Sequence, residues 1–479
     1  MRLRVLAAPV LALLLLSGCT STVSQPGVLT AGLREPATLL PAEVRDQAGR
    51  LVTSALWTPL ADYDPASGKL TPRAAESITS TDQVHWVVRL RPGGRFHDGT
   101  PVTAKSYVDT WQAISASHWA TAALLADTLR AKEITAPDDT TIALTLERPF
   151  GQVPAVLSAP GLVPLPASVL TSHDWAGFAR QPVGNGPFRL TAPWRPGQGG
   201  TLVRVADVPG KAHEVDLRVG DPSAQYDQVK AGELDLATEV PGDRHGAMHT
   251  DFPDRHAMWA LPEATYLAFP VADKRFEDPT VRHGFALAVD RAKLAAGPLG
   301  SQVDPARGVL PPADSPGPAG DACRACVFDG AAAKALVSQS GFTGAATVRV
   351  AAGDQVWAKP MGEQVHGVLG VPVTIADADG PFALTVSLAS PSPHELFAAI
   401  AKATGYADEG FADLLAAADG AGSPEELGRA CRVVEAQLVR DLPAVPLWTA
   451  HGHAVWSERL HDVAATPFGG IGLAGVSVA

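Results

Sequence analysis

Alternating apolar and polar positions predict several β-strands along the chain. His85–Leu90 alternates with a period of two, and the turn-forming run Arg91–Gly94 follows it. Short apolar runs at Ile142–Leu146, Thr347–Val350 and Leu384–Leu388 are also typical of strands. Because helical patterns separate these strands at irregular spacing, we expect an α/β protein with more than one sheet.

Capping residues predict where several helices begin. Asp278 and Pro279 fit the N-cap and first positions of one helix, and Ser423 and Pro424 repeat this arrangement in another. A third helix is predicted to begin at Ser223, whose hydroxyl can accept a hydrogen bond from the first turn. These helices lie between the predicted strands, which again favours an α/β fold.

The first residues of the chain are typical of a secretory signal peptide. Arg2 and Arg4 precede the apolar run Val5–Leu16, which is shorter than the ~20 residues that a membrane-spanning helix needs. The run ends at Cys19 in a segment that resembles the lipobox of bacterial lipoproteins. We therefore predict a signal peptide over residues 1–18, lipidation of Cys19, and a tether over residues 19–27. An ordinary signal peptide with an incidental cysteine is the alternative.

Composition and charge narrow the classes of function. The chain has 38 Lys and Arg against 50 Asp and Glu, a formal net charge of −12, which argues against a nucleic-acid-binding protein. Hydrophobic residues make up 46% of its 479 residues, enough for a packed core in two or three domains. The 45 Gly and 41 Pro predict many turns rather than a helical bundle.

Motifs of catalysis and cofactor binding are weak. Gly470–Gly475 matches the spacing of a dinucleotide-binding loop, but too few residues follow it to form the helix that would hold a pyrophosphate. His245, His249 and His256 could hold a metal on a helix, although nearby proline and glycine favour surface histidines. We therefore predict no enzyme activity, no cofactor and no metal site.

The remaining cysteines suit an exported protein. Cys323 and Cys326 lie in a loop rich in proline and glycine, where an oxidising compartment favours a small-loop disulfide. A redox motif and a zinc site are the alternatives, but the first belongs at a helix start and the second needs another cysteine pair. Cys431 shares a helix face with apolar residues and is interpreted as a buried thiol.

Five segments, in order, resemble the family 5 extracellular solute-binding proteins, the receptors of ABC importers for oligopeptides, dipeptides and nickel. Each segment is a weak signal alone, but their shared order is specific. The segments are Leu70–Ser77 with His85–Trp86 and Leu90–Trp111, then Val183–Leu190, Lys230–Ala237, Phe276–Arg282 with Ala288–Arg291, and Asp441–Trp448.

The resemblance implies a two-lobed α/β fold of the periplasmic-binding-protein type II, in the large peptide-receptor class. A first lobe is expected over residues 28–265, with an extra subdomain at about residues 51–180. A second lobe is expected over residues 266–449, and residues 450–479 return to the first lobe. The lobes of such proteins close about a hinge onto a ligand between them.

The resemblance also implies a binding cleft, and the chain departs from the family there. Ser390 and Ser392 stand where peptide receptors commonly carry an acid that binds the peptide's ammonium group. Either Glu395, Asp379 or Asp408 replaces this acid, or the ligand is not an ordinary free peptide. Gly184–Gly186 permits left-handed backbone and the close approach of a ligand, and a plain turn is the alternative. The predicted cleft residues are Trp57, Asn185, Gly186, Tyr266, Ser390, Ser392, His394, Tyr406 and Trp448.

Two function classes follow from the resemblance. The first is a monomeric, lipid-anchored receptor on the extracytoplasmic face of the membrane, which passes a peptide or peptide-like solute to an ABC permease and its ATPase. The second is a lipoprotein that keeps the scaffold for regulation or envelope assembly, without transport. Cleft aromatics and a buried acid would favour the first class, and a filled or apolar cleft would favour the second.

Overall fold

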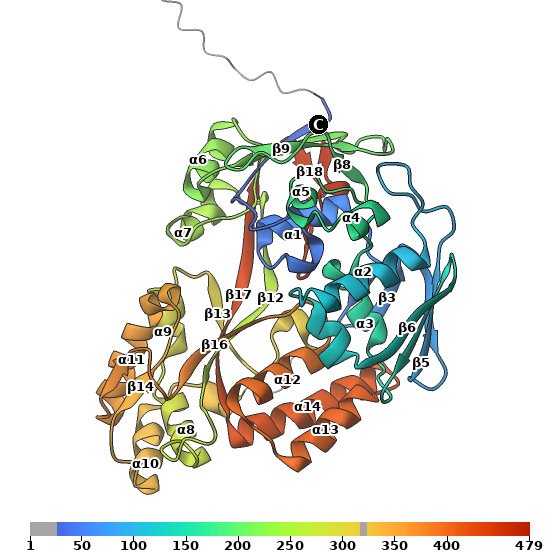
Figure 1. Ribbon diagram of the computed structural model, residues 1–479. Helices are drawn as coiled ribbons and strands as arrows, with labels where there is room; N and C mark the ends of the chain where they lie inside the picture. The colour runs from blue at the N-terminus through green and yellow to red at the C-terminus, as the bar shows by residue number, and fades with distance from the viewer. Residues whose placement is uncertain (1–25, 317–322) are drawn as a thin grey trace, which may run out of the picture.

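The computed structural model describes residues 26–316 and 323–479, and the predicted signal peptide and Cys19 lie outside this part of the chain. Figure 1 shows two lobes joined by long strands, with a smaller sheet and its helices beside the upper lobe. This arrangement confirms the predicted two-lobed α/β fold. No helix of the described residues is long and apolar enough to cross a membrane.

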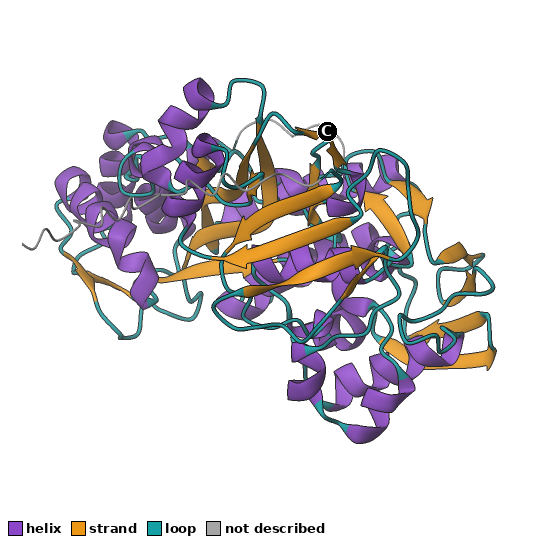
Figure 2. Cartoon of the chain, turned by 90° about the horizontal axis from the view of Figure 1, so that it is seen from above, coloured by secondary structure: helices purple, strands orange, loops and turns teal. Residues whose placement is uncertain are grey.

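A mixed sheet of nine strands runs through both lobes. Strand β1 (Val28–Leu33) pairs in parallel with β10 and β11, and the remaining pairs are antiparallel. Seen from above, the long strands cross the middle of the molecule with helices on either side (Figure 2). The other strands are β8 (Phe188–Leu190), β9 (Gly199–Arg204), β10 (Glu214–Val219), β11 (Leu236–Ala237), β12 (His256–Ala268), β13 (Val303–Pro305), β16 (Phe382–Ser387) and β17 (Ala444–Trp456).

The upper lobe packs helices against β1 and its neighbours. Helix α1 (Gln47–Leu56) begins at Asp46, whose carboxylate accepts a hydrogen bond from the Gly49 amide at 2.7 Å. The helix predicted to begin at Ser223 is α6 (Pro222–Ala231), and its N-cap is Asp221, because Pro222 occupies the first helical position. The other elements are η1 (Pro41–Glu43), α4 (Ala167–Ser172), α5 (Trp175–Arg180) and α7 (Gly242–Asp251).

A four-stranded antiparallel sheet forms the extra subdomain. Its order is β4 (Ala75–Ser80), β5 (His85–Leu90), β7 (Thr141–Leu146) and β6 (Ala131–Asp138). Helix α2 (Ala104–Ala116) packs on this sheet and buries Trp111, whose indole donates to the Leu162 carbonyl at 2.9 Å. The remaining elements are β2 (Ala61–Asp64), β3 (Lys69–Pro72), η2 (Leu124–Thr128), α3 (Val153–Leu157) and η3 (Pro160–Leu162).

The lower lobe is built mainly of helices. The predicted helix starts at Asp278 and Ser423 are confirmed, because each side chain caps the following helix, α8 (Pro279–Leu287) and α14 (Pro424–Asp441). The other elements are α9 (Arg291–Ala296), η4 (Pro312–Asp314), η5 (Arg324–Cys326), α10 (Gly330–Ser340), β14 (Ala346–Val348), η6 (Ala352–Asp354), α11 (Gln355–Leu369), β15 (Val373–Ile375), α12 (Pro393–Thr404) and α13 (Glu409–Asp419).

Strands β12 and β17 connect the two lobes. They pair antiparallel from His256 opposite Val455 to Ala268 opposite Ala444. After β17 the chain packs on the upper lobe, where Leu460, Ile471, Leu473 and Val476 join its core. This last segment contains β18 (Leu460–His461), β19 (Ala465–Thr466), β20 (Gly470–Ile471), η7 (Leu473–Gly475) and β21 (Ser477–Val478).

Candidate functional site

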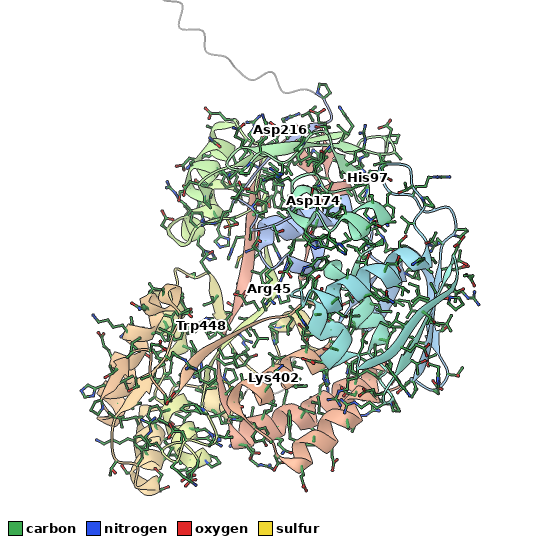
Figure 3. The ribbon with its side chains drawn as sticks, viewed as in Figure 1. Arg45, His97, Asp174, Asp216, Lys402 and Trp448 are labelled. Carbon is green, nitrogen blue, oxygen red and sulfur yellow. A yellow bond between two sulfur atoms is a disulfide. The ribbon has the colours of Figure 1, made fainter. Side chains whose placement is uncertain are left out.

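A cavity of about 820 Å³ opens where the two lobes and the subdomain meet. The upper lobe contributes the start of α1 and the residues before it, the subdomain contributes the region around η2, and the lower lobe contributes β16 and α12. In Figure 3, Arg45 of the upper lobe and Lys402 of the lower lobe are labelled on facing parts of the molecule, and both line this cavity. All three parts of the molecule therefore contribute residues to the lining of this cavity.

Two arginines form the wall that the upper lobe contributes. Arg45 directly precedes the N-cap of α1, and Arg50 lies one turn into the helix. The Arg50 guanidinium donates across the cavity to the Ser387 hydroxyl at 3.2 Å. Burial lowers the pKa of Arg50, the charges of Glu263, Asp46 and Glu395 oppose this effect, and the charge of Arg45 adds to it. This wall therefore carries two close positive charges.

Glu395 lies on the opposite wall, at the start of α12. Its carboxylate accepts hydrogen bonds from the Ala389 amide at 2.9 Å and from the Ser390 amide and hydroxyl, both at 3.1 Å. Burial raises its pKa, although these hydrogen bonds favour the charged form. The carboxylate thus holds the turn that leads into α12.

The other two acids proposed to replace the missing peptide anchor lie elsewhere. Asp379 is exposed in the loop before β16. Asp408 caps α13 through the Phe411 amide and also accepts from the Gln437 side chain at 2.7 Å. Among the three candidates, only Glu395 lines the cavity.

A buried polar network joins the subdomain to the lower lobe beside the cavity. Asp419 accepts a hydrogen bond from His394 at 2.8 Å and forms an ion pair with Arg148 at 2.6 Å. The Ser392 hydroxyl donates to the Gln152 side chain at 2.6 Å. Ser392 and His394 therefore connect parts of the molecule, and of the two only His394 lines the cavity.

The segment Gly184–Gly186 does not line the cavity, and it does not adopt the left-handed backbone that its glycines permit. None of its three residues has a positive φ. A Cβ on Gly186 would lie 2.5 Å from backbone atoms of Leu56 and Trp57, so the close approach is made by the end of α1. The Asn185 side chain accepts from the Thr58 amide at 3.2 Å. These residues pack the upper lobe.

The predicted cleft aromatics pack inside the molecule instead of lining the cavity. Trp57 is buried and donates to the Pro164 carbonyl at 3.0 Å, and buried Tyr266 donates to the Val309 carbonyl at 2.6 Å. Buried Trp448 packs edge-on against Trp357. Tyr406 is half-buried and hydrogen-bonds to Asp441 and Gln437. Each ring fills a core or an interhelical gap, which burial of large aromatic surface favours.

The histidines predicted to be solvated surface residues form a cluster. Helix α7 does form there, and the His249 Nδ1 atom lies 3.2 Å from the His256 Nε2 atom. Strand β17 adds His451 and the buried His453, which the sequence pattern did not connect with them. Within residues 26–316 and 323–479, no group of three His, Cys, Asp or Glu side chains is arranged to hold a metal ion.

The cysteines of the lower lobe are placed as the sequence suggests. Cys323 and Cys326 form a disulfide, with Cα atoms 5.1 Å apart. Cys431 is a free thiol buried on α14, and burial raises its pKa.

Comparison with known proteins identifies the family. The model of the bacterial extracellular solute-binding proteins, family 5, matches residues 69–370. The chain belongs to this family. This result confirms the resemblance found in the five sequence segments.

The individual proteins that this chain resembles share about a quarter of its residues over the matched segments. It is 26% identical over 290 residues to the probable D,D-dipeptide-binding periplasmic protein DdpA of Escherichia coli K12, a match that covers 58% of this chain and 55% of DdpA. It is 27% identical over 286 residues to the glutathione-binding protein GsiB of the same strain, covering 57% and 54%. The matched part thus spans about half the length of these relatives, which are named as binding proteins rather than enzymes.

Solved structures agree on the fold over nearly the whole chain. The murein tripeptide binding protein MppA of Escherichia coli is 17% identical and superposes with a TM-score of 0.77, covering 95% of this chain and 99% of MppA. At this identity the likeness concerns the fold alone, so the cavity has to be interpreted from the residues of this chain.

Sequence reasoning missed the two arginines of this cavity. Arg45 and Arg50 lie just after Leu39–Pro41, where the family resemblance leads us to expect an aspartate that this chain lacks. The sequence pattern that could have pointed to them is a basic residue on each side of Asp46, the N-cap of α1. This pattern indicates a cavity wall only when β16 is known to pass opposite α1. The sequence does not show this, because Ser387 is 337 residues from Arg50.

Proposed function

We propose that this chain is the extracytoplasmic substrate-binding lipoprotein of an ABC importer, capturing a peptide or peptide-like solute between its lobes. The single observation that carries the proposal is the cavity of about 820 Å³, whose walls come from both lobes and the subdomain. A solute that contacts all three favours a closed arrangement of them, which a permease can distinguish from the open one.

The remaining parts of the proposal concern the setting of the receptor. The lobes are assigned to residues 28–265 and 266–449, with the return over 450–479, because β12 and β17 lie at both crossings. Cys19 carries the lipid anchor after removal of residues 1–18. The protein acts as a monomer on the outer face of the cell membrane, and its partners are the permease and ATPase subunits. Relatives named for dipeptide and glutathione binding support a peptide-like solute.

A cavity-filling variant tests the proposal. Ala399 lines the cavity on α12, so Ala399→Trp places an indole in the space where the solute would bind. We expect it to weaken binding by about 100-fold or more, since the solute must then compete with a side chain for the same volume. The measurement is calorimetric titration with the peptides that stabilise the wild-type protein in a thermal-shift panel of di- to pentapeptides.

The matched control lies on the same helix. Ala403 is exposed and does not line the cavity, so Ala403→Trp should leave both binding and folding unchanged. Equal binding by wild type and Ala399→Trp would show that the solute binds elsewhere.

The second function class, an envelope lipoprotein without transport, has one observation in its favour. Among the residues lining the cavity there is no Trp, Tyr or Phe, although the space is neither filled nor purely apolar. A folded wild-type protein that no member of the panel stabilises would favour this class over the importer receptor.

A further inference from the structure

Arg45 and Arg50, on the upper-lobe wall of the cavity, carry positive charges that no ion pair among the described residues neutralises. Arg45 has no ion pair within the described part of the chain, and the hydrogen bond of Arg50 goes to a neutral hydroxyl. Three acids, Glu263, Asp46 and Glu395, act on Arg50 electrostatically without reaching ion-pair distance. Two guanidinium groups that line the same wall of the cavity favour an anion between or beside them.

Two of the three acids of the cavity are already occupied, and the third, Glu147, is exposed. Glu395 is held by three hydrogen bonds from its own turn, and Asp127 lies 3.5 Å from Lys402 across the cavity. The lining as a whole contains four Lys or Arg side chains and three Asp or Glu side chains. A buried ammonium group would therefore find no free carboxylate at a buried position of the lining, and burying an unpaired charge is costly.

We propose that Arg50, with Arg45 beside it, anchors a carboxylate of the solute, and that the cavity needs no ammonium group on that solute. The guanidinium plane of Arg50 presents paired N–H donors that match the two oxygens of a carboxylate. Ser387, across the cavity, holds Arg50 at the position where it meets the solute. This inference rests on the proposed function and specifies the substrate class of the same cavity.

One peptide in three chemical forms tests the assignment. Tripeptides that bind in the thermal-shift panel are prepared as the free form, the N-acetylated form and the C-terminal amide, and each is titrated calorimetrically into the wild-type protein. We expect amidation to weaken binding by about 10-fold or more, because it removes a charge-assisted hydrogen bond, and N-acetylation to change it by less than about 3-fold.

Variants of Arg50 connect this selectivity to the residue. Arg50→Met should weaken binding of the free form to the level of the amide and leave binding of the amide unchanged, while Arg50→Lys should restore part of the difference. Arg73→Met is the matched control, because Arg73 is an exposed arginine paired with Asp62 and lies outside the cavity. If Arg50→Met does not fold, Arg45→Met provides the same comparison at an exposed position.

The outcomes separate the two proposals. Equal affinity for the acid and the amide overturns the carboxylate anchor and leaves the solute receptor in place. A larger loss on N-acetylation than on amidation also overturns the anchor, and it would show that an acid of the cavity binds the ammonium. The absence of binding by every tripeptide in every form overturns the peptide receptor and the anchor together.

Discussion

At the residue scale, burial and charge distinguish side chains that hold the fold from those free to bind. Glu395, Asp419 and Asp408 are acids whose oxygens are taken up by named donors within the protein. Arg45 and Arg50 differ, because the groups around them leave positive charge facing the cavity. A charged side chain that faces a cavity without an ion-pair partner is one of the features that mark a binding site.

The histidine cluster predicts a loss of stability in acid. His453 is buried, and burial together with the positive charge of His245, His451, His249 and His256 lowers its pKa to about 4. The folded protein therefore favours neutral His453, and its contribution to stability is complete above the ordinary pKa of about 6.5. As the pH falls from about 6.5 toward 4, the unfolded state takes up the proton first, and we expect a loss of about 2–3 kcal/mol.

Urea unfolding at a series of pH values measures this dependence. His453→Gln should flatten the decline of unfolding free energy with falling pH, since glutamine does not titrate. His461→Gln, at an exposed histidine, is the control and should keep the wild-type slope. An unchanged slope in His453→Gln would contradict the assignment of the decline to this cluster.

At the element scale, caps fix where helices begin, and packing fixes which face they bury. On α14, Ser423 accepts from the Glu426 amide, and Leu427, Cys431, Val434 and Leu438 are buried together. Both features follow from local sequence, because a capping side chain acts within one turn and the apolar residues repeat with the helical period. The same rules correctly predicted the start of α8. At α6 they predicted a cap at Ser223, two residues after the observed N-cap Asp221.

The thiols test the packing of α14 and the neighbouring turn η5. Cys431 is 1% exposed and burial raises its pKa, so it should react with iodoacetamide only after unfolding. Cys323 and Cys326 should resist alkylation in both states unless a reductant is added, because they form a disulfide. Mass spectrometry of the alkylated protein gives all three results, and rapid labelling of native Cys323 would contradict the disulfide.

At the scale of the whole molecule, the lobes are joined in two ways. Strands β12 and β17 provide the covalent connection, and the network around Asp419 adds a non-covalent one between the lower lobe and the subdomain. In addition, Arg50 and Lys402 reach across the cavity to Ser387 and Asp127. Because Asp419 and Arg148 do not line the cavity, their ion pair is the connection expected to persist when a solute binds.

Removing the charge of Asp419 should loosen the contact between the lobes. Asp419→Asn breaks the ion pair with Arg148 and weakens the hydrogen bond with His394, which we expect to cost about 3 kcal/mol at this buried position. Solution scattering should then show a larger radius of gyration in the absence of solute. Asp413→Asn, at an exposed position of the same helix, is the control. Equal radii for wild type and Asp419→Asn would show that the strands alone set the arrangement.

The sequence by itself determined the family, the α/β class, several helix caps and the pairing of Cys323 with Cys326, because these depend on local chemistry and on motifs in order. It did not determine the cavity. Trp57 and Trp448 are aromatic residues whose burial depends on which distant segments pack around them, and the structure buries both in cores. Arg50 meets Ser387 only because strand β12 carries the chain into the second lobe and β16 returns opposite α1. Contacts between residues hundreds of positions apart are set by the topology of the sheet, so only the tertiary structure decided which side chains face the solute.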